Sequence, residues 1–338
     1  MTKIHVTGGC GFIGSNFVNY WLSKHPDDYI LNLDKMNYAS DENYIDQRLT
    51  RDNYKLINGD IADKKTVFPL IEGIDTIVNF AAESHVDRSI NDPSLFVKSN
   101  YEGVFNLLEA TRKYDLRFHQ VSIDEVYGSL LLNSENKSDE KSPYDPINPY
   151  SATKAAADFL VKSYYNTYRV KATISNCSNN FGPHKHPEKL IPKAILSAIS
   201  NVKIPIYGDG SKIRDWIYVT DHVRGIEAIL DRGNYGDAHL ISSENEQKNI
   251  DMVGRILRLL GKDESLIEFV PDRLGHDERY SINPRKIKDQ LSWKPVFEFN
   301  EALKSTLEHY SKFLGYYLRK MPVQSKKDRK FEIQPPEH

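Results

Sequence analysis

The stretch Thr7-Gly8-Gly9-Cys10-Gly11-Phe12-Ile13-Gly14 decides the fold, because it combines the end of a strand, a glycine turn and the start of a helix. A short β-branched run at 3–6 precedes it, and a helical pattern follows it. Gly8 permits a tight turn, Gly11 lets the backbone approach a pyrophosphate, and Gly14 allows close packing of helix on strand. The helix N-terminus adds oriented N–H donors for phosphate oxygens. The stretch therefore predicts a dinucleotide-binding turn.

An acidic residue after the second expected strand indicates which dinucleotide fits. Asp34 closes the run LNLD twenty residues beyond Gly14, where a ligand for the ribose hydroxyls is needed. Its carboxylate would repel the 2′-phosphate of NADP, so NAD is favoured, although Lys35 beside it carries the opposite charge. Asp60 and Ile61 follow the third expected strand, at the position of an adenine contact. An acidic residue there is also a common turn former.

The first 180 residues alternate short apolar runs with longer helical patterns, which is typical of a parallel sheet. Right-handed crossovers between the runs give an α/β protein with a Rossmann-type doubly wound parallel sheet. A smaller mixed α/β substrate domain should follow it. The expected strands span 3–6, 29–33, 54–57, 76–80, 118–122 and 172–175, and the apolar run at 237–242 would return to the same sheet.

The chain divides into two expected domains and a tail. Residues 1–178 should form the NAD-binding domain, rejoined by about 215–248, and residues 179–320 a discontinuous substrate domain. Residues 321–338 form a polar, basic tail. A helix is expected at 188–200, and a last amphipathic helix should pack on the body through apolar residues three and four apart: Leu303, Leu307, Tyr310, Leu314 and Tyr317.

Composition excludes several classes of function. Lys and Arg number 45 against 47 Asp and Glu, so no broad positive field exists to bind nucleic acid. No apolar run reaches the roughly 18 residues of a membrane span, and the first residues show no signal-peptide pattern. The two cysteines, Cys10 and Cys177, fit a reducing compartment and exclude a disulfide framework or a Cys-rich zinc site. We therefore expect a cytoplasmic protein without nucleic-acid or membrane partners.

Two residue pairs carry candidate chemistry. Tyr150 and Lys154 lie four apart at the start of a helix, so both side chains project from one face. The ammonium would lower the pKa of the phenol from about 10 toward neutrality, and a phenolate can take a hydroxyl proton while hydride leaves the same carbon. Asp124 and Glu125 follow a strand and can share one site if the backbone turns there. Two carboxylates in unlike surroundings could then divide the roles of base and acid.

Longer motifs resemble those of the dTDP-glucose 4,6-dehydratases, a family of extended short-chain dehydrogenases/reductases. The resemblance covers residues 2–317. The glycine turn and the YxxxK pattern are common to the whole superfamily, whereas AAESHVDRSI, DEVYG and PEKLIP are more specific and favour a 4,6-dehydratase over an epimerase. The motifs are TGGCGFIGSN (7–16), LNLDKMNYAS (31–40), AAESHVDRSI (81–90), DEVYG (124–128), PYSATKAAAD (149–158), SNNFGPHKHPEKLIP (178–192), YGDGSKIRDWIYVTDH (207–222), RLGHDERY (273–280) and WKP (293–295).

The resemblance implies an internal redox cycle on a nucleotide-linked hexose. C4 is oxidised by NAD, water is lost across C5 and C6, and hydride returns to C6. Carried onto this sequence, Tyr150 is the C4 base and Lys154 its electrostatic and ribose partner. Glu125 becomes the base at C5, and Asp124 the acid for the C6 oxygen.

The resemblance also implies residues that bind NAD and substrate. We further expect a homodimer, and no metal, because His184, His186 and Glu188 have no cysteine or further carboxylate at a suitable spacing. Implied NAD contacts, together with the turn glycines Gly8, Gly11 and Gly14, are Phe12, Ile13, Asp34, Lys35, Asn37, Asp60, Ile61, Phe80, Ala81, Ala82, Ser84, Ser99, Tyr150, Lys154 and Asn180. Implied substrate contacts are Ser84, Asp124, Glu125, Asn179, Glu188, Lys189, Leu190, Pro205, Tyr207, Arg214, Asn249, Arg273, His276 and Tyr280. Arg214 and Arg273 suit a pyrophosphate, since a guanidinium can donate two parallel hydrogen bonds.

One position departs from the family pattern. Ile123 stands where the family usually has Thr, whose hydroxyl completes a Ser/Thr-Tyr-Lys triad, and Ser122 should face the other way along a strand. Losing such a bond is worth roughly 1 to 3 kcal/mol. Three readings stay open beside a dTDP-glucose or UDP-glucose dehydratase: a UDP-N-acetylglucosamine 4,6-dehydratase, a dehydratase that also epimerises C5, and a catalytically silent NAD-binding scaffold.

Overall fold

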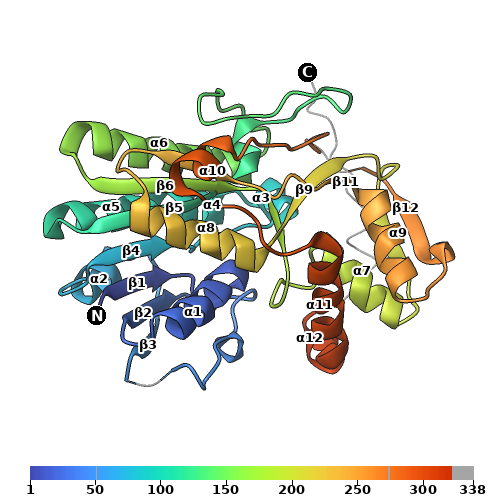
Figure 1. The fold of residues 1–338 in the computed structure, drawn as a ribbon, viewed down its shortest axis with the longest axis horizontal. Coiled ribbons are helices and arrows are strands. Elements are labelled where there is room, and N and C mark those ends of the chain that lie inside the picture. Colours follow the sequence, from blue (N-terminus) through green and yellow to red (C-terminus); the bar gives the residue numbers. More distant parts are fainter. Residues whose placement is uncertain (51, 273–274, 322–338) are drawn as a thin grey trace.

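A seven-stranded, wholly parallel sheet forms the centre of the computed structural model, which describes residues 1–50, 52–272 and 275–321 (Figure 1). The strand order is β10-β6-β5-β4-β1-β2-β3. All six expected strands and the returning seventh are confirmed. They span β1 (Lys3–Thr7), β2 (Tyr29–Asp34), β3 (Tyr54–Asn58), β4 (Thr76–Asn79), β5 (Arg117–Ile123), β6 (Lys171–Cys177) and β10 (Ala238–Ile241).

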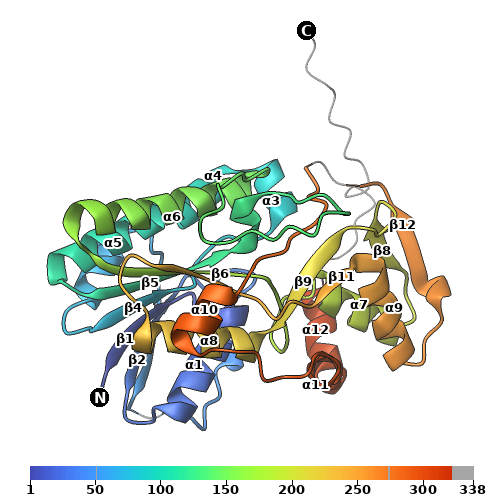
Figure 2. The same cartoon turned by 45° about the horizontal axis from the view of Figure 1, so that its top comes forward.

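Helices cover both faces of this sheet, which explains why its strands read as continuous apolar runs. Neighbouring residues alternate between two cores: Val78 of β4 packs with the helices of one face, and Ile77 with those of the other. One layer contains α1 (Phe12–Lys24), α8 (Val219–Arg232) and α10 (Arg285–Leu291), and the other contains α2 (Lys64–Val67), α5 (Gly103–Tyr114) and α6 (Pro149–Tyr168) (Figures 1 and 2). Short helices α3 (Val86–Asn91) and α4 (Ser94–Phe96) lead into α5 through a π-helical turn, Val97–Glu102.

A smaller mixed α/β region lies beyond the carboxyl ends of these strands (Figure 1). Its three-stranded sheet joins β7 (Asn179–Phe181) in parallel to β9 (Ile213–Tyr218), which pairs antiparallel with β11 (Glu246–Lys248). A second pair joins β8 (Ile204–Tyr207) to β12 (Ile267–Val270). Helices α7 (Leu190–Ile199), α9 (Asn249–Leu259), α11 (Phe299–Lys312) and α12 (Leu314–Lys320) share one apolar core with these strands. The numerical domain boundaries given above stay a prediction.

The C-terminal helix differs from its expected form. Leu303, Leu307, Tyr310 and Tyr317 are buried in the core of the smaller region, which confirms the apolar face. However, the helix breaks at Phe313 (φ −107°, ψ 27°) into α11 and α12. The periodic apolar residues therefore lie on two consecutive helices, α11 and α12. The tail at 322–338 lies outside the described residues.

Close contact between β1 and α1 fixes the glycine turn. Gly8 adopts φ +71°, which favours glycine, and a Cβ there would lie 2.6 Å from the Ala81 nitrogen. A Cβ on Gly14 would lie 2.2 Å from the Gly8 carbonyl oxygen. A Cβ on Gly11 would meet only that same oxygen, at 3.3 Å. Gly14 is therefore required by packing, while the face of Gly11 is open enough to admit a ligand.

We expect Gly14→Ala to lower the free energy of unfolding by about 1 to 3 kcal/mol, because α1 must move off the turn. Gly11→Ala is the matched control, since Gly11 has an ordinary φ of −79°. It should lower stability by less than about 1 kcal/mol while weakening dinucleotide binding. Urea unfolding of both variants measures the difference. Equal destabilisation would contradict the packing role of Gly14.

Candidate active site

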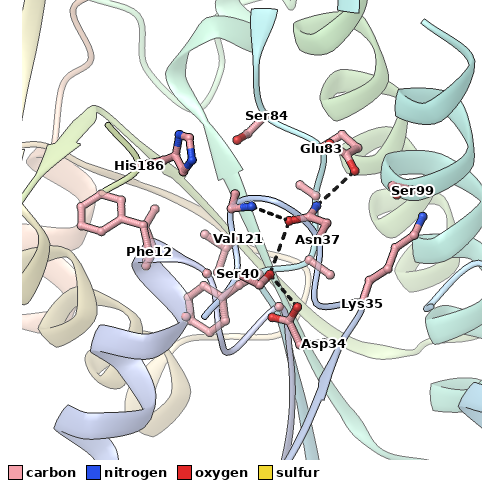
Figure 3. Close-up of a pocket in the computed structure, with 18 of the residues that line it drawn as sticks. Phe12, Asp34, Lys35, Asn37, Ser40, Glu83, Ser84, Ser99, Val121 and His186 are labelled. Atoms are coloured by element: carbon pink, nitrogen blue, oxygen red, sulfur yellow. Dashed lines mark hydrogen bonds between the residues drawn. The ribbon is translucent and has the colours of Figure 1, made fainter. Parts of the chain in front are cut away.

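A pocket opens at the carboxyl ends of β1, β2, β3, β4 and β5, beside the glycine turn (Figure 3). It brings together every expected NAD contact except Asn180. Asn180 lies on β7, where its amide donates to the Cys177 sulfur and the Ser178 carbonyl and its Oδ1 lies 3.0 Å from His222 Nδ1. The pocket therefore contains the other expected contacts, and their role in binding NAD stays a prediction.

Asp34 is held in place as a ribose ligand would be. Its carboxylate accepts hydrogen bonds from the N–H groups of Cys10 (2.8 Å) and Met36 (2.9 Å). It also accepts one from the Ser40 hydroxyl (2.7 Å), which Figure 3 shows. Lys35 forms an ion pair with Asp60 at 3.0 Å, so its charge is engaged and does not mark a site for a 2′-phosphate. With the open face of Gly11 and the N-terminus of α1, these residues fit NAD.

Asn100 is a positioning residue that the sequence analysis missed. Its side chain bonds both the N–H (2.9 Å) and the carbonyl (3.0 Å) of Glu83, in the pocket wall after β4. Its amide also donates to Thr153 of α6 at 3.0 Å. Asn100 thus ties the pocket wall to the helix that carries Tyr150 and Lys154. It lies in the π-helical turn before α5, and no spacing in the sequence marks it.

The Tyr150–Lys154 pair lies in the first turns of α6, as expected. Asn148 and Ser151 form a reciprocal capping box and Pro149 occupies the first turn, so this helix has a well-defined start. Tyr150 is buried and lines the pocket, with its ring edge toward Phe96. Lys154 donates from Nζ to the Val121 carbonyl at 2.7 Å, which anchors the ammonium on β5.

The expected lowering of the Tyr150 pKa is wrong. Burial raises the pKa of the phenol well above its usual value, and the charge of Glu125 adds to the rise. Burial also lowers the pKa of Lys154. Spacing along a helix places the two side chains on one face, but it gives no information on how much water surrounds them. These surroundings therefore favour the neutral phenol of Tyr150.

The backbone turns at the acidic pair, as shared use of the two carboxylates requires. Asp124 and Glu125 begin a 3₁₀ turn, Asp124–Tyr127, directly after β5. Gly128 ends it at φ +78°, and a Cβ there would lie 2.4 Å from the Asp145 carbonyl. Burial, then the charges of Glu125 and Asp215, raise the pKa of Asp124 well above its usual value. One Asp124 oxygen has no hydrogen-bond partner among the described residues. A protonated Asp124 could therefore act as an acid.

Ile123 and Ser122 lie as the sequence analysis expected. The Ser122 hydroxyl donates to Asp158 at 2.7 Å, two helical turns along α6 from Tyr150. Ile123 lines the pocket and packs in the apolar cluster that contains Tyr150 and Phe96. The position beside Tyr150 is therefore apolar, and Ser122 does not replace the absent hydroxyl.

The expected substrate contacts lie in several parts of the structure. Ser84, Glu188 and Lys189 line the same pocket. Burial raises the pKa of Tyr280, and the charge of Glu125 adds to it, so Tyr280 lies near the acidic pair; Arg214 stacks on the Tyr280 ring at 4.4 Å. The expected contacts that do not line this pocket are Asp124, Glu125, Asn179, Leu190, Pro205, Tyr207, Arg214, Asn249, His276 and Tyr280. Arg273 lies outside the described residues.

Glu188 is more constrained than a free substrate ligand would be. Its carboxylate oxygens lie 3.2 Å from the Tyr38 hydroxyl, 3.3 Å from His85 Nε2 and 3.6 Å from an Arg88 guanidinium nitrogen. Arg88 stacks over the Tyr38 ring at 3.5 Å. Pocket residues that the sequence analysis did not single out as part of this site are Leu33, Tyr38, Ala39, Ser40, Gly59, Val121, Cys177, Lys185 and His186.

Other kinds of site find no support in the described part of the chain. Within it, no group of three or more His, Cys, Asp and Glu side chains is arranged to hold a metal ion. None of its helices combines the length and apolar character needed to span a bilayer. Cys10 and Cys177 are both buried free thiols.

Comparison with known proteins identifies the family. The family model described as GDP-mannose 4,6 dehydratase matches residues 6–306. The dTDP-glucose 4,6-dehydratase of Mycobacterium tuberculosis strain H37Rv is 44% identical over 309 residues, 91% of this chain and 93% of the relative. This chain belongs to the nucleotide-sugar 4,6-dehydratase family. A Haloferax volcanii relative, the low-salt glycan biosynthesis protein Agl12, is 45% identical over 90% of this chain and 97% of its own.

Solved structures of this dehydratase family share the fold. The dTDP-glucose 4,6-dehydratase DesIV of Streptomyces venezuelae, solved with NAD and TYD bound, is 37% identical with a TM-score of 0.92 and covers 95% of this chain and 100% of its own. The Bacillus anthracis enzyme, in complex with NAD, is 39% identical with a TM-score of 0.88 over 95% and 100%. A Thermotoga maritima UDP-glucose 4-epimerase, 23% identical with a TM-score of 0.85 over 93% and 100%, shares the fold.

The effect of the apolar side chain of Ile123 on catalysis can be tested by substitution. If a hydroxyl beside Tyr150 assists proton transfer, Ile123→Thr should raise kcat/KM by up to about tenfold over the isosteric control Ile123→Val. The measurement compares both variants on dTDP-glucose, UDP-glucose and UDP-N-acetylglucosamine. A change in sugar preference shared by both variants would show that Ile123 shapes the pocket. Identical kinetics for Thr and Val on every sugar would contradict the triad role.

Proposed function

We propose that this chain is an NAD-dependent hydro-lyase that converts an NDP-hexose, of the dTDP-glucose or UDP-glucose type, to the NDP-4-keto-6-deoxyhexose. The observation that carries the proposal is the adjacent pair Asp124–Glu125 in the turn directly after β5. This pair follows the pocket residue Ile123, and its charges act on Tyr150. A dehydrogenase or epimerase has no need for an acid and a base beyond its tyrosine. Water elimination needs both.

Tyr150 and Lys154 would serve the oxidation at C4. When bound, NAD would supply the hydride acceptor and the positive charge that favours a Tyr150 phenolate. Tyr150 would take the C4 hydroxyl proton, because its phenol is buried in the pocket wall where no bulk water competes. Lys154, fixed by the Val121 carbonyl, would hold a second positive charge near that phenolate.

Asp124 and Glu125 would take separate roles in the elimination of water. Glu125 would remove the C5 proton, which the C4 ketone acidifies. Asp124, whose pKa burial raises, would be protonated at neutral pH and give its proton to the departing C6 oxygen.

The nucleotide and sugar are proposed from the relatives. The Mycobacterium tuberculosis, Streptomyces venezuelae and Bacillus anthracis proteins described above are named dTDP-glucose 4,6-dehydratases, so dTDP-glucose is the first substrate to test and UDP-glucose the second. UDP-N-acetylglucosamine and C5 epimerisation remain the alternatives. Incubation with a panel of dTDP- and UDP-hexoses, with mass spectrometry for the loss of one water, tests the activity itself. The cytosolic location stays a prediction.

A homodimer is also proposed, with one candidate interface. Helices α5 and α6 cover the same sheet face side by side, and aromatic side chains on their outer surface are exposed: Tyr101 in the turn before α5, Phe105 on α5 and Phe159 on α6. We propose that a second copy of this chain binds to this surface. Two helices from each copy can pair about a two-fold axis and bury these rings symmetrically.

The split between base and acid predicts a trapped intermediate. Glu125→Gln should stop C5 deprotonation but leave oxidation at C4 possible, so enzyme-bound NADH should accumulate with about one equivalent per site. The measurement is absorbance at the NADH band after substrate is mixed with the holoenzyme. Asp215→Asn, which changes another buried acid near Asp124, is the control for altered charge alone. Unchanged water elimination by Glu125→Gln would contradict the assignment.

The candidate interface predicts the oligomeric state. Phe105→Asp and Phe159→Asp should each convert the dimer to a monomer, because a charge would be buried in the interface. Phe269→Asp is the matched control, since Phe269 is an equally exposed aromatic residue on β12. Sedimentation velocity measures the mass. A monomeric parent, or a Phe269 variant that dissociates as readily, would overturn the proposal.

A further inference from the structure

The last helix reaches a loop nearly 280 residues earlier in the chain. Lys320, at the end of α12, donates from Nζ to an Asp41 carboxylate oxygen at 2.5 Å. Tyr316, one turn before it, donates its hydroxyl to the same oxygen. The Lys320 ammonium also lies 4.9 Å from the Tyr44 ring centroid and 4.7 Å from that of Tyr316. Two donors on one face of α12 therefore converge on one carboxylate.

Asp41 belongs to the loop that forms one wall of the cofactor pocket. The Asp41 N–H donates to the Cys10 carbonyl in the glycine turn at 2.9 Å. Its neighbour Ser40 donates to Asp34 at 2.7 Å and lines the pocket, as Figure 3 shows. A chain of contacts thus runs from α12 through Asp41 and Ser40 to the carboxylate that faces a ribose.

The contact between α12 and the loop is largely shielded from water. The Asp41 and Lys320 side chains are 12% and 22% exposed, so salt screens them less than an ordinary surface pair. Burial alone would raise the pKa of Asp41, but the hydrogen bonds from Lys320 and Tyr316 outweigh it and lower the pKa to about 2. Asp41 is thus charged at any working pH.

A second line of contacts runs from the same helix to α1. Lys320 Nζ lies 3.4 Å from the Tyr44 hydroxyl. The Tyr44 ring stacks on His184 at 4.5 Å with 4° between the planes, and His184 Nδ1 lies 3.1 Å from the Ser15 hydroxyl in α1. The loop is therefore clamped between α12 and the helix whose N-terminus would bind the pyrophosphate.

We propose that Lys320 and Tyr316 are positioning residues for the dinucleotide: through Asp41 they hold the loop at 37–44 against the pocket and slow the release of NAD. This inference rests on the proposed function for the identity of the dinucleotide. An internal hydride cycle gains from a cofactor that stays bound between turnovers. Neither residue touches the reacting carbons, so the chemical steps should be insensitive to them once NAD is bound.

Exchange of radiolabelled NAD from the full-length holoenzyme into excess unlabelled NAD tests the inference. Lys320→Met and Tyr316→Phe should each accelerate exchange by roughly three- to tenfold, the worth of one hydrogen bond. The value of kcat at saturating NAD should stay within about twofold of the parent. Lys320→Arg should exchange like the parent. Lys304→Met, which breaks an exposed ion pair with Glu301 on α11, is the matched control and should also exchange like the parent.

The possible outcomes distinguish a failure of the proposed clamp from a failure of the proposed function. Faster exchange in the Lys320 and Tyr316 variants, with kcat retained and rescue by Arg, supports the clamp. Exchange at the rate of the Lys304 control overturns it, as does a parallel loss of kcat and of folded protein in both variants. A parent that binds no NAD overturns the proposed function instead.

Discussion

The close approach of α1 to β1 is the constraint on which the rest of the structure depends. Only glycine fits at position 14, because a Cβ there would overlap the Gly8 carbonyl oxygen. That approach aims the first turn of α1 at the carboxyl edge of the sheet. Every other strand then delivers its end to the same edge: β2 brings Asp34, β4 brings the wall fixed by Asn100, and β5 brings the acidic pair. Parallel strands make this convergence unavoidable.

Burial gives these side chains their chemistry and also makes them costly. Tyr150, Lys154 and Asp124 are all shielded from water, and each is shifted toward its neutral form. The same shielding means that a bound ligand with charge changes the protonation of several groups together, because their charges are weakly screened.

The sequence predicted what local pattern determines. The seven strands follow from β-branched runs and the turn from its glycines, and Asp34 and the Tyr150–Lys154 pair follow from fixed offsets within one unit. Features that are set by tertiary packing could not be predicted from the sequence. The break at Phe313, the contact of Lys320 with Asp41 and the ties from Asn100 join segments that no spacing relates. The pKa of Tyr150 was predicted in the wrong direction because desolvation depends on what surrounds a helix face, and periodicity does not report it.

The central claim is that one pocket oxidises C4 and later delivers the same hydride to C6 without releasing it. A mixture of dTDP-glucose carrying deuterium at C4 and dTDP-glucose carrying carbon-13 throughout the ring tests it, with mass spectrometry of the product. The account predicts deuterium in the C6 methyl group of molecules without carbon-13, and none in molecules with it. Deuterium lost to water, transferred to the carbon-13 product or found in free NADH would contradict it.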